Sequence, residues 1–146
     1  MRSGRTFPWT GLAVGLGVLV AALGGGQHAA RGTSSKGVVV EAREFAFVPS
    51  RITARRGSPL VLRIRNVGKQ KHDFLSSLLR SGEAEVTAAG VTVEGEIEEV
   101  ELEPGAEAVI RMLPKRAGTF EFWCSVLEGG RLHRDLGMRG LIRVAP

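Results

Sequence analysis

Residues 120–144 read FEFWCSVLEGGRLHRDLGMRGLIRV. The stretch opens with alternating apolar and polar side chains and reaches Cys124, the only cysteine of the chain. A glycine-containing segment follows and carries His133 and Met138, after which the alternation returns. Alternation with a period of two is typical of a strand with one buried face. The stretch therefore predicts two β-strands joined by a loop, with three side chains suited to a soft or borderline metal on or beside that loop.

The same short pattern recurs towards the N-terminus. Residues 60–66, LVLRIRN, place Leu60, Leu62 and Ile64 on one face and two arginines on the other. Further extended segments are expected in the ranges 38–47, 52–56, 97–102 and 107–113, with Gly- and Pro-containing turns between them. Seven or eight short strands at this spacing predict an all-β antiparallel sandwich or barrel.

Two segments of the middle of the chain have no clear strand pattern. Residues 75–79 fit either a helical turn or a loop, and residues 81–95 read as irregular and Gly-punctuated. Val91 and Val93 alternate within the second segment, which suggests pairing at the edge of a sheet.

The N-terminus has the three parts of an export signal. Arg2 and Arg5 precede an apolar run at residues 11–24, and small residues follow. The run is short for a spanning helix, which needs about 20 residues, but residues 9–26 form a longer apolar span. The prediction is a cleaved signal peptide or retained membrane anchor at residues 1–30, a linker at 31–37 and one folded domain at 38–146. Either alternative places the domain outside the cytoplasm, in the periplasm or an equivalent compartment.

A lone cysteine excludes an internal disulfide framework. In an exported protein such a thiol is either a small buried side chain or a ligand for a soft metal. His133 and Met138 follow Cys124 on the same loop. His72 follows the strand at residues 60–66, at a loop that would lie at the same end of a sandwich. The sequence therefore predicts that these four side chains meet.

Two imidazoles, one thiolate and one distant thioether suit copper in both oxidation states, and a long bond to methionine tunes the reduction potential. His72, Cys124 and His133 are the candidate ligands of one copper ion, with Met138 as a weak fourth ligand. Because both imidazoles must be neutral and the thiol must ionise, binding should weaken as the pH falls. Met112 lies on an alternating segment and is expected in the core.

The opening stretch resembles the C-terminal signature of the small blue copper proteins, the cupredoxin family that includes plastocyanin- and azurin-like proteins. Residues 66–74, NVGKQKHDF, are similar to the segment that bears the first histidine of that family, and residues 44–66 to its N-terminal strands. The resemblance implies a Greek-key β-sandwich with copper at one end and a role in one-electron transfer. It also implies that Asp73 braces the His72 loop against Ser125.

The chain departs from the family pattern in two places. Eight residues separate Cys124 from His133, several more than is usual, and the extra ones fall within LEGGRL at residues 127–132. Glu128 lies in this longer loop and is expected on the surface, although replacing or joining the axial ligand is an alternative. The acidic segment between Gly82 and Glu103 has no counterpart in the family.

Charge is distributed unevenly along the chain. Seven basic residues and no acid occur in residues 51–71, whereas residues 81–110 contain nine glutamates and no base. Basic residues also flank the two loops with the candidate ligands, namely Lys69, Lys71, Arg131, Arg134 and Arg139. They predict a redox protein partner with an acidic docking face, and the glutamate-rich segment is expected to lie elsewhere. An exported chain with few aromatic residues does not suit nucleic-acid binding.

The composition argues against an enzyme. A multicopper oxidase needs further histidine clusters, and a binuclear copper centre of the respiratory-oxidase kind needs a second cysteine. No Ser-His-Asp or paired-carboxylate arrangement is recognisable either. The predicted function is a copper-binding one-electron carrier. A copper-binding or copper-delivery module without electron transfer uses the same residues and remains an alternative, and a structural domain with a vestigial site is a third.

Overall fold

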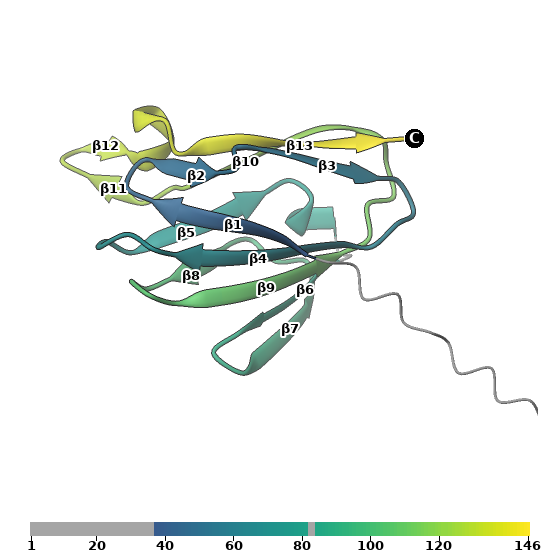
Figure 1. Ribbon diagram of the computed structural model, residues 1–146, viewed down its shortest axis with the longest axis horizontal. Helices are drawn as coiled ribbons and strands as arrows, with labels where there is room; N and C mark the ends of the chain where they lie inside the picture. The colour runs from purple at the N-terminus through teal and green to yellow at the C-terminus, as the bar shows by residue number, and fades with distance from the viewer. Residues whose placement is uncertain (1–36, 82–83) are drawn as a thin grey trace, which may run out of the picture. The chain divides into compact units, whose positions relative to one another are not determined.

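The computed structural model describes residues 37–81 and 84–146. Two sheets pack face to face in this part of the chain (Figure 1). The first sheet has the strand order β2-β1-β4-β9-β6-β7, and the second has the order β3-β13-β10-β5-β8. Strands β11 and β12 form a separate hairpin. The described residues contain no α-helix, only the 3₁₀ turns η1 and η2. The expected all-β sandwich is therefore confirmed.

The strands of the first sheet are β1 (Val38–Arg43), β2 (Ala46–Val48), β4 (Leu60–Asn66), β6 (Ala84–Ala88), β7 (Val91–Gly95) and β9 (Glu107–Met112). Those of the second are β3 (Arg51–Arg55), β5 (His72–Ser76), β8 (Val100–Leu102), β10 (Gly118–Trp123) and β13 (Arg139–Ala145). The hairpin comprises β11 (Leu127–Glu128) and β12 (Arg131–Leu132), and the 3₁₀ turns are η1 (Leu79–Ser81) and η2 (His133–Leu136).

The predicted signal or anchor segment lies outside the described residues, as does the linker up to residue 36. Within residues 37–81 and 84–146, no helix has both the length and the apolar character needed to cross a membrane.

The inward faces of the two sheets form the core. In β4, Leu62 and Ile64 are fully buried, as the alternation of that segment predicted. Three aromatic rings meet between the sheets: Phe74 stacks on Phe122 with ring centroids 5.2 Å apart, and Phe47 packs edge-on against both. Offset and edge-on aromatic contacts of this kind stabilise a core beyond their buried area. The core therefore joins strands from both halves of the chain.

The expectation of a purely antiparallel arrangement was wrong for two strand pairs. Strand β1 runs parallel to β4, and β13 runs parallel to β3. The chain crosses from one sheet to the other between β2 and β3 and again between β3 and β4. Because two parallel strands require such a crossover rather than a tight hairpin, pattern alone did not reveal their pairing.

The chain is a strand from His72 to Ser76, which corrects the start of the helical turn or loop expected over residues 75–79; a turn follows at residues 77–78, and the 3₁₀ turn η1 begins at Leu79. Every residue of β5 is buried, so the strand lacks the alternation used to recognise the others. It pairs with β10 on one side and with β8 on the other. Uniform burial is typical of a strand that is covered on both faces, and periodicity cannot identify it.

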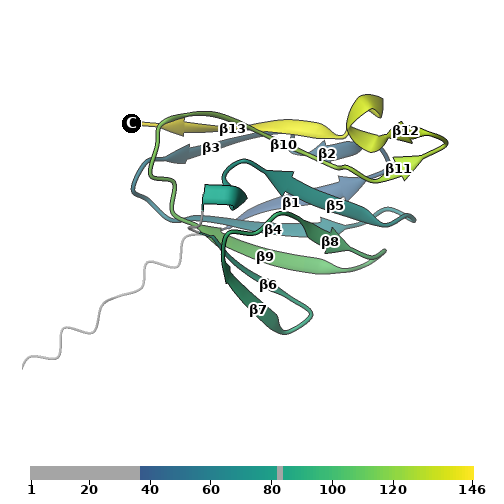
Figure 2. The same cartoon turned by 180° about the vertical axis from the view of Figure 1, so that it is seen from behind.

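Residues 84–95 form the regular hairpin β6–β7, which corrects the expectation of an irregular segment. Ala89 and Gly90 make its turn with φ angles of 49° and 79°, the left-handed values that a two-residue hairpin turn requires. Val91 and Val93 lie on β7, the edge strand, as predicted. In Figures 1 and 2 this hairpin projects from one edge of the sandwich.

One end of the sandwich gathers the segments that carry the candidate ligands. Strand β4 ends there and β5 begins there, and β10 leads into the β11–β12 hairpin at the same end (Figure 1). Segments that are distant in sequence thus become neighbours in space.

Gly140 lies at a tightly packed position of the second sheet. A β-carbon at this position would overlap the Phe122 ring and the carbonyl oxygen of Ser50. That oxygen also accepts a hydrogen bond from the Leu141 amide at 2.8 Å, which opposes relaxation. We expect Gly140→Ala to lower the free energy of unfolding in urea by about 2 to 3 kcal/mol, as overpacked cores do. Leu141→Ala, on the exposed face, should cost much less, and equal losses would contradict this account of the packing.

Candidate metal centre

Backbone hydrogen bonds fold the loop between β10 and β13 back on itself. The Cys124 amide donates to Met138 O at 3.0 Å, and the Met138 amide donates to His133 O at 3.0 Å. The His133 amide donates to Val126 O at 2.8 Å, and the Arg134 amide donates to Cys124 O at 3.0 Å. These bonds connect Cys124, His133 and Met138 through the main chain, so the backbone holds the three residues close together.

Three of the predicted ligand side chains converge. Cys124 Sγ lies 3.5 Å from His133 Nδ1 and 4.0 Å from His72 Nδ1. The three ligand atoms all lie within 4.8 Å of one another, and the three residues are fully buried. Metal bonds of about 2.0 Å to nitrogen and about 2.3 Å to sulfur at a trigonal angle would separate sulfur from nitrogen by about 3.7 Å. The observed spacings bracket that value, so the residues fit one metal ion.

Met138 is also fully buried and lies next in space to this group through its main-chain bonds to Cys124 and His133. His72, Cys124 and His133 form a possible metal site with Met138 buried beside them, and copper is the cofactor that this fold and donor set indicate. Met112 is a core residue on β9, only 4% exposed, as predicted.

Asp73 joins the two halves of the site. Its Oδ1 accepts a hydrogen bond from the Ser125 amide at 2.6 Å, and its Oδ2 accepts one from Ser125 Oγ at 2.6 Å. Its own amide points at Cys124 Sγ, 3.5 Å away. The pair therefore holds the start of β5, where His72 lies, against the segment that follows Cys124.

Asn66 is a structural residue whose importance the sequence did not single out. Its Nδ2 donates to Gln70 O at 2.7 Å and to Leu102 O at 2.9 Å, and its Oδ1 accepts from the Gly68 amide at 2.9 Å. A β-carbon on Gly68 would lie 2.7 Å from Glu44 Oε1 and 3.0 Å from His72 Nε2, so a larger residue there would have to displace both side chains. The Asn-x-Gly motif at residues 66–68 was the signal in the sequence that could have identified these structural roles of Asn66 and Gly68.

Burial controls the protonation of the ligands. It raises the pKa of the Cys124 thiol to about 12, despite backbone N–H groups that favour the thiolate. Burial, followed by the neighbouring His133, lowers the pKa of His72. At neutral pH His72 is thus in the neutral form that binds metals, whereas the thiol keeps its proton until a metal replaces it.

The long loop forms the β11–β12 hairpin, in which Gly129 and Gly130 have φ angles of 56° and 78°. The side chain of Glu128 is 41% exposed, yet its Oε2 lies 3.5 Å from His133 Nε2. That nitrogen is not the one that faces Cys124. Glu128 therefore approaches the outer side of the imidazole of a candidate ligand. The Phe45 ring also packs edge-on against His133, with ring centroids 5.2 Å apart.

The five basic residues predicted for docking differ in their surroundings. Lys71 Nζ pairs with Glu101 Oε1 at 2.6 Å. Arg134 lies 3.6 Å from Glu121 and 5.1 Å above the Trp123 ring. Lys69, Arg131 and Arg139 are exposed, and none of the three makes an ion pair within the described ranges.

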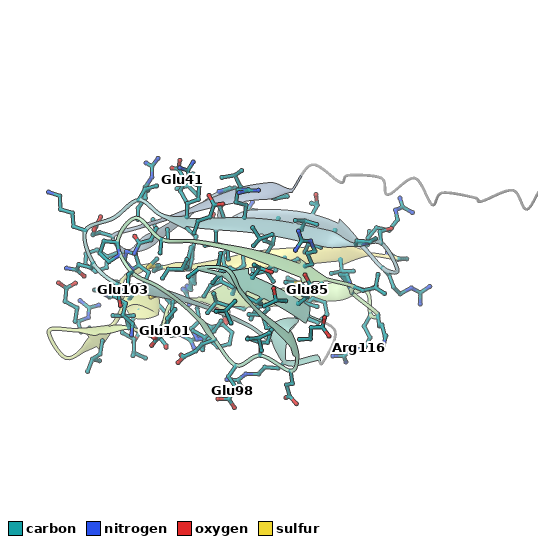
Figure 3. The ribbon with its side chains drawn as sticks, turned by 90° about the horizontal axis from the view of Figure 1, so that it is seen from below. Glu41, Glu85, Glu98, Glu101, Glu103 and Arg116 are labelled. Atoms are coloured by element: carbon teal, nitrogen blue, oxygen red, sulfur yellow. The ribbon has the colours of Figure 1, made fainter. Side chains whose placement is uncertain are left out.

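The glutamate-rich segment does not lie wholly away from the candidate site, which corrects that expectation. Glu101 contacts Lys71 directly, immediately before His72. Figure 3 shows Glu101 and Glu103 towards the end that carries the β11–β12 hairpin, with Glu85 further along the sandwich. The cause is strand β8, which pairs with the first residues of β5.

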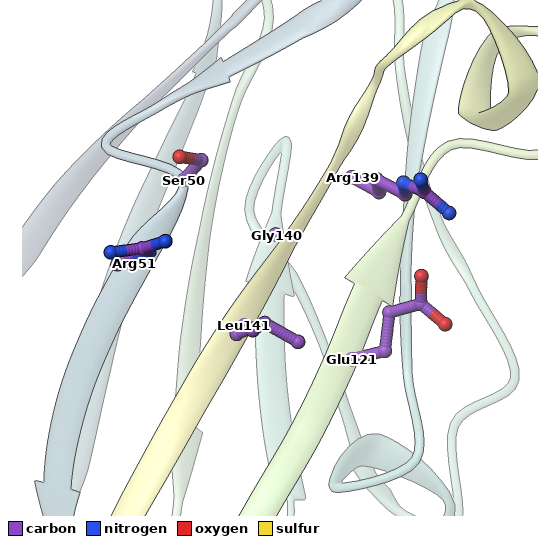
Figure 4. Close-up of a pocket in the computed structure, with 6 residues that line it drawn as sticks. All are labelled: Ser50, Arg51, Glu121, Arg139, Gly140 and Leu141. Carbon is purple, nitrogen blue, oxygen red and sulfur yellow. The ribbon is translucent and has the colours of Figure 1, made fainter.

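Arg139 also borders a shallow pocket of about 390 Å³ on the outer face of the second sheet (Figure 4). The pocket is lined by Ser50, Arg51, Glu121, Arg139, Gly140 and Leu141. It contains no histidine or cysteine side chain, and its charged groups project from the exposed faces of β3, β10 and β13. The candidate metal centre is therefore separate from this pocket.

The sequence model of a protein family, the cupredoxin-like domain, matches residues 14–132, which is most of the chain. The match includes His72 and Cys124 and ends one residue before His133. The chain belongs to the cupredoxin-like family, and its resemblance to the small blue copper proteins is confirmed. A search of curated proteins found no match.

Solved structures show the same fold. The dithionite-reduced auracyanin of Roseiflexus castenholzii is 18% identical with a TM-score of 0.56, covering 77% of this chain and 98% of its own. The multi-copper oxidase of Pediococcus acidilactici is 14% identical with a TM-score of 0.61 over 78% of this chain and 27% of the oxidase. The Cu-containing nitrite reductase of Thermus scotoductus SA-01 is 16% identical with a TM-score of 0.57, over 74% and 30%. At these identities the comparison concerns the fold alone.

Asp73→Ala should remove two hydrogen bonds to a buried carboxylate and leave the Ser125 amide without its acceptor. We expect a loss of about 3 kcal/mol in the free energy of unfolding, measured by urea denaturation. Ser125→Ala removes only the hydroxyl contact and should cost about 1 kcal/mol. If the two variants were equally stable, Asp73 would not be the residue that joins these segments.

Proposed function

We propose that this protein is a one-electron carrier that binds a single copper ion through His72, Cys124 and His133, with Met138 as a weak fourth ligand. The observation that carries the proposal is the convergence of one sulfur and two imidazole nitrogens within 4.8 Å inside a water-excluded end of the sandwich. Copper bound by such a donor set supplies reversible one-electron chemistry between Cu(II) and Cu(I).

The protein's own part in electron transfer is to keep the ligands still. Cys124, His133 and Met138 are tied to one another through main-chain hydrogen bonds, and His72 is tied to the same loop through Asp73 and Ser125. A geometry that changes little between oxidation states keeps the energetic cost of electron transfer low. Full burial also keeps solvent from rearranging around the ligands.

A carrier fits this chain better than an enzyme does. Four protein ligands would leave no open position for a substrate, which a catalytic metal requires. The similar multi-copper oxidase and nitrite reductase share the fold over 27% and 30% of their own chains. The auracyanin, by contrast, is covered over 98% of its length.

Adding Cu(II) to the protein should produce an intense visible band from thiolate-to-copper charge transfer. Cys124→Ser should abolish this band, because no other thiol exists in the chain. Met138→Leu should retain the band but change the reduction potential, since a weak axial ligand tunes the site without creating it. The measurements are visible absorption and a redox titration. A band that survived in the Cys124 variant would refute the proposed ligand set.

The same titration separates a carrier from a copper-delivery module. A carrier should retain copper through repeated oxidation and reduction, whereas a delivery module should lose Cu(I) to a soluble Cu(I) chelator after reduction. Loss of copper at the first reduction would favour delivery over electron transfer.

We further propose that the domain works outside the cytoplasm, as the N-terminal sequence suggests, and that its redox partner offers an acidic docking face. Support for the docking face comes from Lys69 and Arg131, which are exposed on the two loops that carry the ligands. Lys71 and Arg134 already contact carboxylates of this chain and contribute less to net attraction.

Small inorganic complexes can test the docking charge without a known partner. The rate of reduction by anionic ferrocyanide should fall as salt rises from about 10 mM to about 0.5 M, because exposed charges are screened. The double variant Lys69→Ala/Arg131→Ala should react more slowly with ferrocyanide at low salt. Its control, Arg55→Ala/Arg56→Ala, removes the same charge where β3 ends and should have little effect. Equal rates for the two double variants would eliminate this docking site.

A further inference from the structure

The longer loop brings a carboxylate to the outer edge of the His133 ring. Glu128 Oε2 lies 3.5 Å from His133 Nε2. Both atoms are shielded from solvent, and neither has a hydrogen-bond partner among the described residues. A polar atom buried without a partner is costly, and a charged one more so. Since an imidazole N–H donates and a carboxylate accepts, each atom offers what the other lacks.

The position of Glu128 is built by both ligand-bearing loops. Glu128 pairs with Arg131 across the β11–β12 hairpin, and this pairing fixes the position of the Glu128 backbone. Its second oxygen, Oε1, accepts a hydrogen bond from Gln70 Nε2 at 2.6 Å. Gln70 lies two residues before His72 on the loop after β4. The carboxylate therefore bridges the loop of His72 and the loop of His133, and Oε2 is left directed at the imidazole.

The ring of His133 is oriented by what lies on its two sides. Nδ1 faces Cys124 Sγ at 3.5 Å, and Nε2 faces Glu128. A histidine ligand needs a free nitrogen towards the metal and a proton on the other nitrogen, and the partner of that second nitrogen sets the tautomer. The 3.5 Å separation between Glu128 Oε2 and His133 Nε2 is longer than a typical hydrogen bond of about 2.9 Å, and Oε2 has no other hydrogen-bond partner among the described residues.

We propose that Glu128 is a positioning residue, whose carboxylate accepts a hydrogen bond from His133 Nε2–H, fixes the tautomer with Nδ1 free, and lowers the reduction potential of the bound copper. This inference rests on the proposed function of the site. The potential falls because a nearby negative charge stabilises Cu(II) more than Cu(I), and burial of the contact weakens the screening by water. The extra loop residues thus have a function, which is to supply this charge.

Glu128→Gln is the sharpest test, because it removes the charge while its amide oxygen can still accept the bond from Gln70. We expect the ratio of Cu(II) to Cu(I) affinity to fall about tenfold, which is a rise of about 59 mV in the one-electron potential. Glu94→Gln removes the same charge from an exposed position on β7 and should leave the potential unchanged. If both variants kept the wild-type potential, the proposal would be overturned.

A second readout does not depend on bound copper. Nitrogen-15 NMR of the copper-free protein at pH 8 reports which nitrogen of His133 carries the proton. We expect the Nε2–H tautomer in the wild type and a mixture of tautomers in Glu128→Gln, with Glu94→Gln like the wild type. An Nδ1–H tautomer in the wild type would overturn the positioning role. If copper gave no charge-transfer band, the proposed electron carrier would fail, and this measurement would still decide what Glu128 does.

Discussion

The end of the sandwich depends on one constraint: a thiol and two imidazoles must remain close together and out of water. Each of these groups would be better solvated apart, so other interactions have to hold them. The main-chain bonds among Cys124, His133 and Met138 do this on one loop, and the two short bonds between Asp73 and Ser125 tie that loop to His72. A copper ion bound here would offset the remaining cost, because it would replace the thiol proton and could be held by both imidazoles.

The long loop changes the surroundings of the site more than its ligands. With the β11–β12 hairpin in place, Nδ1 of His133 still faces Cys124. The hairpin adds the carboxylate of Glu128 next to Nε2, on the opposite edge of the ring. Glu128, which accepts a hydrogen bond from Gln70, lies at the outer nitrogen of the His133 imidazole, and the Phe45 ring packs edge-on against the same imidazole. Two domains of this fold can therefore share a ligand set and differ in the charge and dryness around it, which are the properties that set a reduction potential.

Much of the fold followed from pattern, and the errors have a common cause. Strands with one exposed face, such as β4 and β13, were predicted from their alternation. Strand β5 was missed because it is buried on both faces, and the β6–β7 hairpin was missed because its turn is formed by Ala89 and Gly90 rather than by a stronger turn pair. The parallel pairs β1–β4 and β3–β13 were missed because they form only after the chain changes sheet.

The sequence by itself indicated which atoms could bind a metal: the sulfur of Cys124, the imidazoles of His72 and His133 and the thioether of Met138, in an order that resembles one family. Ligand chemistry is a property of residue type, so no coordinates were needed for that step. Only the tertiary structure decided that Glu128 lies against His133, that Lys71 is already paired with Glu101, and that both imidazoles are fully buried. These facts depend on contacts between segments far apart in the chain, where burial and screening are set by neighbours that no local pattern specifies.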